Sequence, residues 1–184
     1  NGAMLVAQRG TSSTDAGYGS IDRISRQVGG TDEAPVFAQV DVASGTTPYT
    51  NGFRKALKIT NGNQTSGAGS ADYLYFWYIA EAQDIANSGW NYTDSNSFIT
   101  LSFWVKSSVA QNFYGVFYTA DGTPQTYVWE TGSLTADTWT KITKTVPGNS
   151  NLQFDNDNGA GLYVAPIRAF DGTDRTASMS LNAW

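Results

Sequence analysis

Hydrophobic and polar residues alternate with a period of two along most of the chain, and the helical period of 3.6 is nearly absent. Runs of β-branched and aromatic residues are separated by loops rich in Gly, Asn, Asp and Thr. The pattern predicts ten strands, over residues 3–8, 19–28, 36–42, 53–60, 72–81, 98–106, 112–119, 125–130, 138–146 and 160–169. Only residues 79–89 have a helical pattern, and that run is short. These features indicate an all-β protein, an antiparallel β-sandwich or barrel of about ten strands.

Within the run 98–106, the alternation over residues 99–106 has one residue that does not fit. The odd-numbered residues there are apolar and the even-numbered residues are polar, except that Trp104 falls on the polar face. The sequence "SSVAQ" separates this run from 112–119 and suggests a hairpin. If Val105 pairs with Tyr114, Trp104 faces Gly115 and covers its backbone, which is a structural role. The alternatives are that Trp104 lies in a subunit interface or that it stacks on a glycan.

The run 72–81 is apolar on both faces. One face carries Tyr73, Tyr75 and Trp77, and the other carries Leu74, Phe76 and Tyr78. We expect one face to pack in the core, whereas the other binds a ligand or forms a subunit interface. Trp and Tyr suit a glycan, because their rings stack on the apolar C–H face of a sugar. The candidate ligand-binding residues are therefore Tyr73, Tyr75, Trp77 and Trp104.

Composition narrows the possible functions. With 184 residues, a mass of 19.8 kDa and 40% hydrophobic residues, the chain suits a single domain spanning residues 1–184. A net charge of −5 without basic clusters argues against nucleic acid or an anionic membrane as partner. No apolar run is long enough to span a membrane. The chain has no Cys and no His, which excludes disulfides and all thiolate or imidazole chemistry within it.

Carboxylates are the remaining candidates for chemistry. A glycosidase needs two carboxylates that flank the scissile bond, and Glu81 after "YFWYIA" is the best single candidate. A structural role for Glu81 is the preferred interpretation, and we expect no catalysis. In "DNDNG", Asp155 and Asp157 supply the oxygen ligands that a structural Ca²⁺ prefers. The alternative for this segment is a plain Asx-turn, with no cofactor.

Five segments occur in an order and spacing that resemble a group of tailed-bacteriophage virion proteins. They are "NGAMLVAQRGTSS", "YGSIDR", "LSFWVKSS", "TWTKITKTVPG" and "GAGLYV", and together they extend over nearly the whole chain. The sequence departs from that family where Ile24 follows Asp22-Arg23 in place of Trp, and where Lys144 occupies a position that is often apolar.

The resemblance implies a jelly roll similar to carbohydrate-binding modules. It implies a non-catalytic virion module, a tail-fibre or head-decoration domain that adheres to host-surface polysaccharide and forms part of a longer virion protein. Other virion proteins would be its partners, and a homo-oligomer, such as a trimer, is expected. Two alternatives stay open: a carbohydrate-binding module of a polysaccharide-degrading enzyme, and a purely structural capsid-cement domain.

Overall fold

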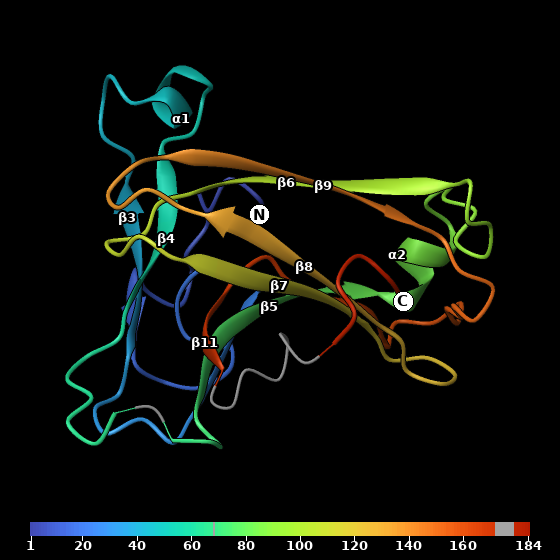
Figure 1. Ribbon diagram of the computed structural model, residues 1–184. Coiled ribbons are helices and arrows are strands. Elements are labelled where there is room, and N and C mark those ends of the chain that lie inside the picture. The colour runs from blue at the N-terminus through green and yellow to red at the C-terminus, as the bar shows by residue number, and fades with distance from the viewer. Residues whose placement is uncertain (68, 172–178) are drawn as a thin grey trace. The chain divides into compact units, whose positions relative to one another are not determined.

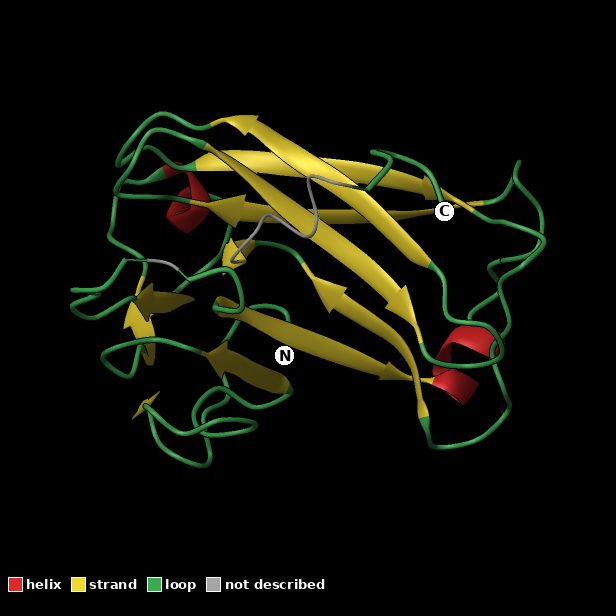
Figure 2. Cartoon of the chain, turned by 60° about the horizontal axis from the view of Figure 1, so that its bottom comes forward, coloured by secondary structure: helices red, strands yellow, loops and turns green. Residues whose placement is uncertain are grey.

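A computed structural model describes residues 1–67, 69–171 and 179–184. The protein is all-β, with antiparallel sheets in a sandwich-like arrangement, so the predicted fold class is confirmed (Figures 1 and 2). The described strands are β1 (Ser12–Ser13), β2 (Ile24–Gly29), β3 (Val36–Asp41), β4 (Lys55–Thr60), β5 (Tyr73–Glu81), β6 (Phe98–Val105), β7 (Asn112–Thr119), β8 (Thr126–Ser133), β9 (Thr140–Pro147), β10 (Ala160–Ala165) and β11 (Arg168–Asp171). Two short helices, α1 (Thr47–Thr50) and α2 (Ala82–Ala86), accompany them.

The chain divides into two compact units. The first contains Asn1–Trp77 together with β11, and the second contains Tyr78–Ile167 together with residues 179–184. The boundary falls within β5, so residues 73–77 of this strand belong to the first unit and residues 78–81 to the second. Both units belong to one polypeptide, and the single domain over residues 1–184 stays a prediction.

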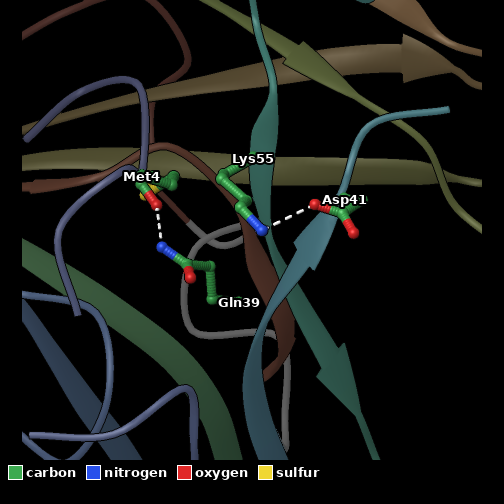
Figure 3. A network of polar contacts seen from close by, with 4 residues as sticks. All are labelled: Met4, Gln39, Asp41 and Lys55. Carbon is green, nitrogen blue, oxygen red and sulfur yellow. Dashed lines mark hydrogen bonds and ion pairs between the residues drawn. The ribbon is translucent and has the colours of Figure 1, made fainter. Parts of the chain in front are cut away.

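The first unit contains a three-stranded sheet in the order β1-β3-β4. β3 and β4 pair along their whole length, from Val36 opposite Thr60 to Asp41 opposite Lys55. The last of these pairs is an ion pair, with Lys55 Nζ 2.6 Å from Asp41 Oδ1 (Figure 3). On β3 the side-chain amide of Gln39 also donates to the carbonyl oxygen of Met4 (Figure 3). β3 therefore fixes the segment that precedes the first strand.

The rest of the first unit is built on the N-terminal half of β5. β2 and β11 both pair with β5, and Arg168 of β11 lies opposite Tyr75. Leu74 points away from Tyr73 and Tyr75 along this strand and is fully buried, as is Phe37 of β3. One face of this part of β5 therefore packs in the interior, as the sequence predicts.

The second unit has two layers. One is a sheet in which residues 78–81 of β5 pair with β10, β10 with β7, and β7 with β8. The other is the long pair β6–β9, visible in Figure 1 as two adjacent strands. The apolar side chains of both layers form two buried clusters, and the larger one, which includes loop residues, consists of Trp90, Phe117, Tyr127, Trp129, Val146, Leu152, Phe154 and Leu162. Burial of this cluster is the main force that holds the layers together.

Some predicted elements differ from the structure. The strand predicted over 3–8 is wrong, because these residues form a loop. The Asn1 side chain bonds both the N–H and the C=O of Val6, and Met4 has a φ of 56°, a left-handed conformation. The run 160–169 is split into β10 and β11 around Pro166, which has no N–H to donate to a ladder. The helical pattern predicted over 79–89 is confirmed over α2 (Ala82–Ala86), whereas 79–81 belong to β5.

The predicted hairpin between 98–106 and 112–119 is also wrong. β6 pairs with β9, and Trp104 lies opposite Lys141. β7 pairs with β8 and β10, and the residue opposite Gly115 is Trp129. An aromatic ring does cover the Gly115 backbone, but it is the ring of Trp129, which is fully buried.

No helix among the described residues is long and apolar enough to cross a membrane.

Candidate ligand-binding site

Three of the predicted ligand-binding residues form an aromatic row along one face of β5. Tyr73, Tyr75 and Trp77 alternate with the inward-facing residues, so their side chains share a face. The ring centroids of Tyr73 and Tyr75 are 5.7 Å apart, and those of Tyr75 and Trp77 are 5.2 Å apart. All three side chains are half-buried. The row is therefore continuous and reaches the surface of the first unit.

Arg168 extends this row from the neighbouring strand. Its guanidinium carbon lies 4.1 Å from the centroid of the Tyr75 ring and 5.6 Å from that of Trp77. A cation at this distance is attracted to the negative face of an aromatic ring. The Tyr75 and Trp77 rings meet edge to face, at an interplanar angle of 77°. Arg168 thus lies over the rings of both Tyr75 and Trp77, and closer to that of Tyr75.

Tyr73 has a structural contact of its own. A Cβ atom added at Gly29 of β2 would lie 2.5 Å from Tyr73 Cε1, so the Tyr73 ring rests directly on the glycine backbone. An aromatic ring over a strand glycine shields the exposed backbone, which stabilises the pairing of β2 with β5. Within the row, Tyr73 therefore serves the fold, and ligand contact by Tyr75 and Trp77 stays a prediction.

Trp104 lies in the second unit, on β6. Phe103 and Val105 on either side of it pack against a buried cluster of Phe113, Leu134 and Ile142. Trp104 therefore points to the opposite face, as the alternation predicts, and it is half-buried. The structural role predicted for Trp104 over Gly115 is wrong, because β6 does not pair with β7.

The segment that contains Asp155 and Asp157 forms turns. Asp157 Oδ1 accepts a hydrogen bond from the N–H of Gly159 at 2.9 Å, which is the geometry of an Asx-turn. The N–H of Asp155 donates to Asp121 Oδ2 at 3.0 Å. Over the described ranges no group of three or more acidic, His or Cys residues is placed to hold a metal ion. The structural Ca²⁺ at Asp155 and Asp157 stays a prediction.

The three glutamates all accept hydrogen bonds within the fold. Glu81 Oε2 accepts from the side-chain amide of Gln83 at 2.7 Å, and Glu130 Oε2 accepts from that of Asn112 at 2.8 Å. Glu33 Oε2 accepts from the backbone N–H of Asn63. These contacts give each carboxylate a structural role.

The neighbouring Asp32 holds the loop 61–67. The backbone N–H of Ser66 donates to Asp32 Oδ2 at 2.7 Å, and the Ser66 hydroxyl donates to Asp32 Oδ1 at 2.7 Å. These bonds, the backbone one first, favour the ionised form and hold the pKa of Asp32 below its ordinary value.

Arg26 is the buried cation of the first unit, and no pattern in the sequence singles it out. Only 5% of its surface is exposed, and its guanidinium carbon lies 5.3 Å from the centroid of the Phe37 ring. Burial lowers the pKa of Arg26, and the charge of Asp15 partly offsets this effect. Among the described residues, Nε and Nη1 of Arg26 have no hydrogen-bond partner. This charge is therefore held in the interior at a cost in stability.

No family model, curated protein or solved structure matches this chain. The resemblance to phage virion proteins thus stays a prediction, and the function must be argued from the site itself.

Proposed function

We propose that this protein is a non-catalytic adhesion module that binds glycans, carried on a phage virion as a tail-fibre or head-decoration domain. The observation that carries the glycan-binding part is the aromatic row Tyr73, Tyr75 and Trp77 on one face of β5, with Arg168 against it. The virion context is supported by the sequence resemblance.

The chemistry of the row suits a sugar. The apolar C–H face of a pyranose ring stacks on the indole of Trp77, while its hydroxyl groups bond to polar groups at the edge. A row of half-buried rings is also held rigidly by its neighbours, so little side-chain entropy is lost when a ligand binds.

Glycan-array binding of the isolated protein, repeated with Trp77→Ala, tests this function. Because Trp77 is half-buried on a surface row, the variant should lose glycan binding and keep most of its thermal stability. Tyr18→Ala is the matched control, since Tyr18 is an aromatic residue of the same unit that is 45% exposed. Binding that survives Trp77→Ala, or a Trp77→Ala variant that melts like a core deletion, would remove the row from the proposal.

The proposed virion role also includes self-association, because fibre-type appendages are cyclic oligomers. Light scattering should give the mass of an oligomer, a trimer in the simplest case. A particle of 19.8 kDa at high micromolar concentration would contradict this part of the proposal.

A further inference from the structure

The outward face of the β6–β9 pair carries two tryptophans and two lysines in a small square. Trp104 lies directly opposite Lys141 in the ladder. One step further along the same face, Lys106 follows β6 and Trp139 precedes β9. Lys106 Nζ lies 5.5 Å from the centroid of the Trp139 ring, which places these two side chains together. We name these four residues the Trp-Lys face.

This face is open to solvent. Thr100 and Ser102 of β6 and Thr143 and Thr145 of β9 continue it, and all four are exposed. Lys106 and Lys141 are exposed too, whereas the two tryptophans are half-buried. The inner face of the same strands carries the apolar residues that pack in the core. The tryptophans are therefore additional to what the core of this unit needs.

The charge of the Trp-Lys face differs from that of the whole chain. The protein has a net charge of −5, yet residues 98–106 and 138–147 contain three lysines and no acidic residue. Lys144, the third, belongs to the inner face opposite Leu101. The nearest acidic residue in sequence, Asp137, forms no ion pair with Lys106 or Lys141 in the described structure. Two cations beside two aromatic rings are thus available to an anionic ligand.

We propose that the Trp-Lys face binds an acidic polysaccharide, with a sugar ring stacked on Trp104 and its carboxylate paired with Lys141 or Lys106. The spacing supports this ligand. Residues directly opposite in an antiparallel ladder have Cβ atoms about 5 Å apart, so the flexible Lys141 ammonium reaches a carboxylate at the edge of a sugar on Trp104. Trp139, on the diagonal, lies close enough to contact the next sugar of the chain.

A polysaccharide fits this face better than a nucleic acid does. Affinity for nucleic acid depends on many phosphate contacts and rises with the number of basic groups. Only two lysines project from the Trp-Lys face, and the protein as a whole is acidic. Stacking combined with one or two charge pairs is sufficient for a carboxylated sugar. This inference rests on the proposed glycan-binding function and adds a ligand class and a second surface to it.

The test measures binding of the full chain to polygalacturonate by titration calorimetry, with fully methyl-esterified polygalacturonate as the uncharged counterpart. The carboxylated polymer should bind more tightly, and added salt should weaken it, because exposed charges are screened. The Lys106→Gln/Lys141→Gln double variant should weaken binding about 2- to 10-fold, as expected for two exposed charge pairs. Lys58→Gln, which removes an exposed lysine from β4, is the matched control and should change nothing.

Trp104→Ala should weaken binding of the carboxylated polymer about tenfold or more, because it removes the stacking surface. Its melting curve is recorded alongside, and the lysine variants carry the test if this variant does not fold. Equal binding of the charged and esterified polymers, or no effect of the lysine changes, would overturn the inference. Comparable binding of single-stranded poly(dT) would also overturn it in favour of nucleic acid.

The same experiment separates this inference from the proposed function. If Trp77→Ala abolishes polygalacturonate binding while Trp104→Ala leaves it intact, the aromatic row of β5 is the glycan site and the Trp-Lys face is not. If only the Trp104 and lysine variants lose binding, the inference holds and the row has another role. Absence of binding to any glycan would reject both.

Discussion

Replacing Gly115 with Ala should destabilise the second unit, because the backbone of β7 lies against the indole of Trp129 at this point. A Cβ atom at residue 115 would lie 2.5 Å from the carbonyl oxygen of Pro166, and closer still to Cε2 and Nε1 of Trp129. Trp129 is fully buried, and its ring packs edge-on against Phe117 with centroids 5.0 Å apart. Because Trp129 is fully buried, its ring is hemmed in by its neighbours.

The expected loss can be estimated from two opposing effects. Overpacking of a well-packed core costs about 1–3 kcal/mol. Gly115 is not among the glycines with positive φ, so Ala can adopt its backbone conformation. Ala then restricts the unfolded chain and gains about 0.4–1 kcal/mol. Since the Cβ atom would meet both a ring and a backbone oxygen, the upper half of the overpacking range applies, and the net loss is about 1–2.6 kcal/mol. This loss lowers the melting temperature of a protein of this size by about 2–10 °C.

Differential scanning calorimetry measures this change. Gly2→Ala is the matched control, because an added Cβ at Gly2 meets nothing within 4 Å and its φ is not positive. The control should melt like the parent protein. An unchanged melting temperature for Gly115→Ala would show that Trp129 and Pro166 do not crowd this residue, and would refute the packing described for β7 and β8.

Three further predictions concern charges. Arg26→Met replaces a poorly paired buried charge, so the free energy of unfolding, measured in urea, should stay the same or rise by up to about 4 kcal/mol. A clear decrease in this free energy would contradict the prediction. The pKa of Asp32 is lower in the folded protein than in the unfolded chain, so the ionised carboxylate stabilises the fold at pH values above the unfolded pKa, and this stabilisation is lost as the pH falls through the folded pKa. The melting temperature of Asp32→Asn should therefore fall less steeply than that of the parent below about pH 4. If Asp155 and Asp157 bind Ca²⁺, EDTA should lower the melting temperature relative to excess calcium, whereas identical curves would reject the site.

The period-two pattern was sufficient to predict most strands, because each strand needs one face in the core. It failed where hydrogen bonds between a side chain and the backbone produce a loop in place of a strand. Residues 3–8 have the composition of a strand, yet the side chain of Asn1 satisfies the backbone of Val6 and closes a loop. Bonds of this kind depend on one side chain folding back onto the chain, and no periodicity reveals them.

The same distinction applies to the candidate ligand-binding residues. The shared face of Tyr73, Tyr75 and Trp77 follows from alternation within one strand, and their ring contacts agree with it. Arg168 and Trp139 were not predicted as candidate residues. Arg168 lies against the predicted residue Tyr75, and Trp139 lies against Lys106, which is two residues from Trp104. Both come from a different strand from the one they contact. Such contacts require the strand pairing, which a single sequence does not specify.

Strand pairing also decides which aromatic ring covers Gly115, and a double-mutant cycle can identify it. The hairpin expected from proximity in sequence would place Trp104 there, whereas the structure places Trp129 there. Trp129→Phe removes part of the ring that a Cβ atom added at residue 115 would meet. The substitution breaks no hydrogen bond, because Trp129 Nε1 has no hydrogen-bond partner among the described residues. Gly115→Ala should therefore cost at least about 0.5 kcal/mol less in a Trp129→Phe background than in the parent. In a Trp104→Phe background the cost should be unchanged within about 0.5 kcal/mol, because residues without contact behave additively. Coupling to Trp104 in place of Trp129 would mean that β6 pairs with β7 after all, and the Trp-Lys face would not exist.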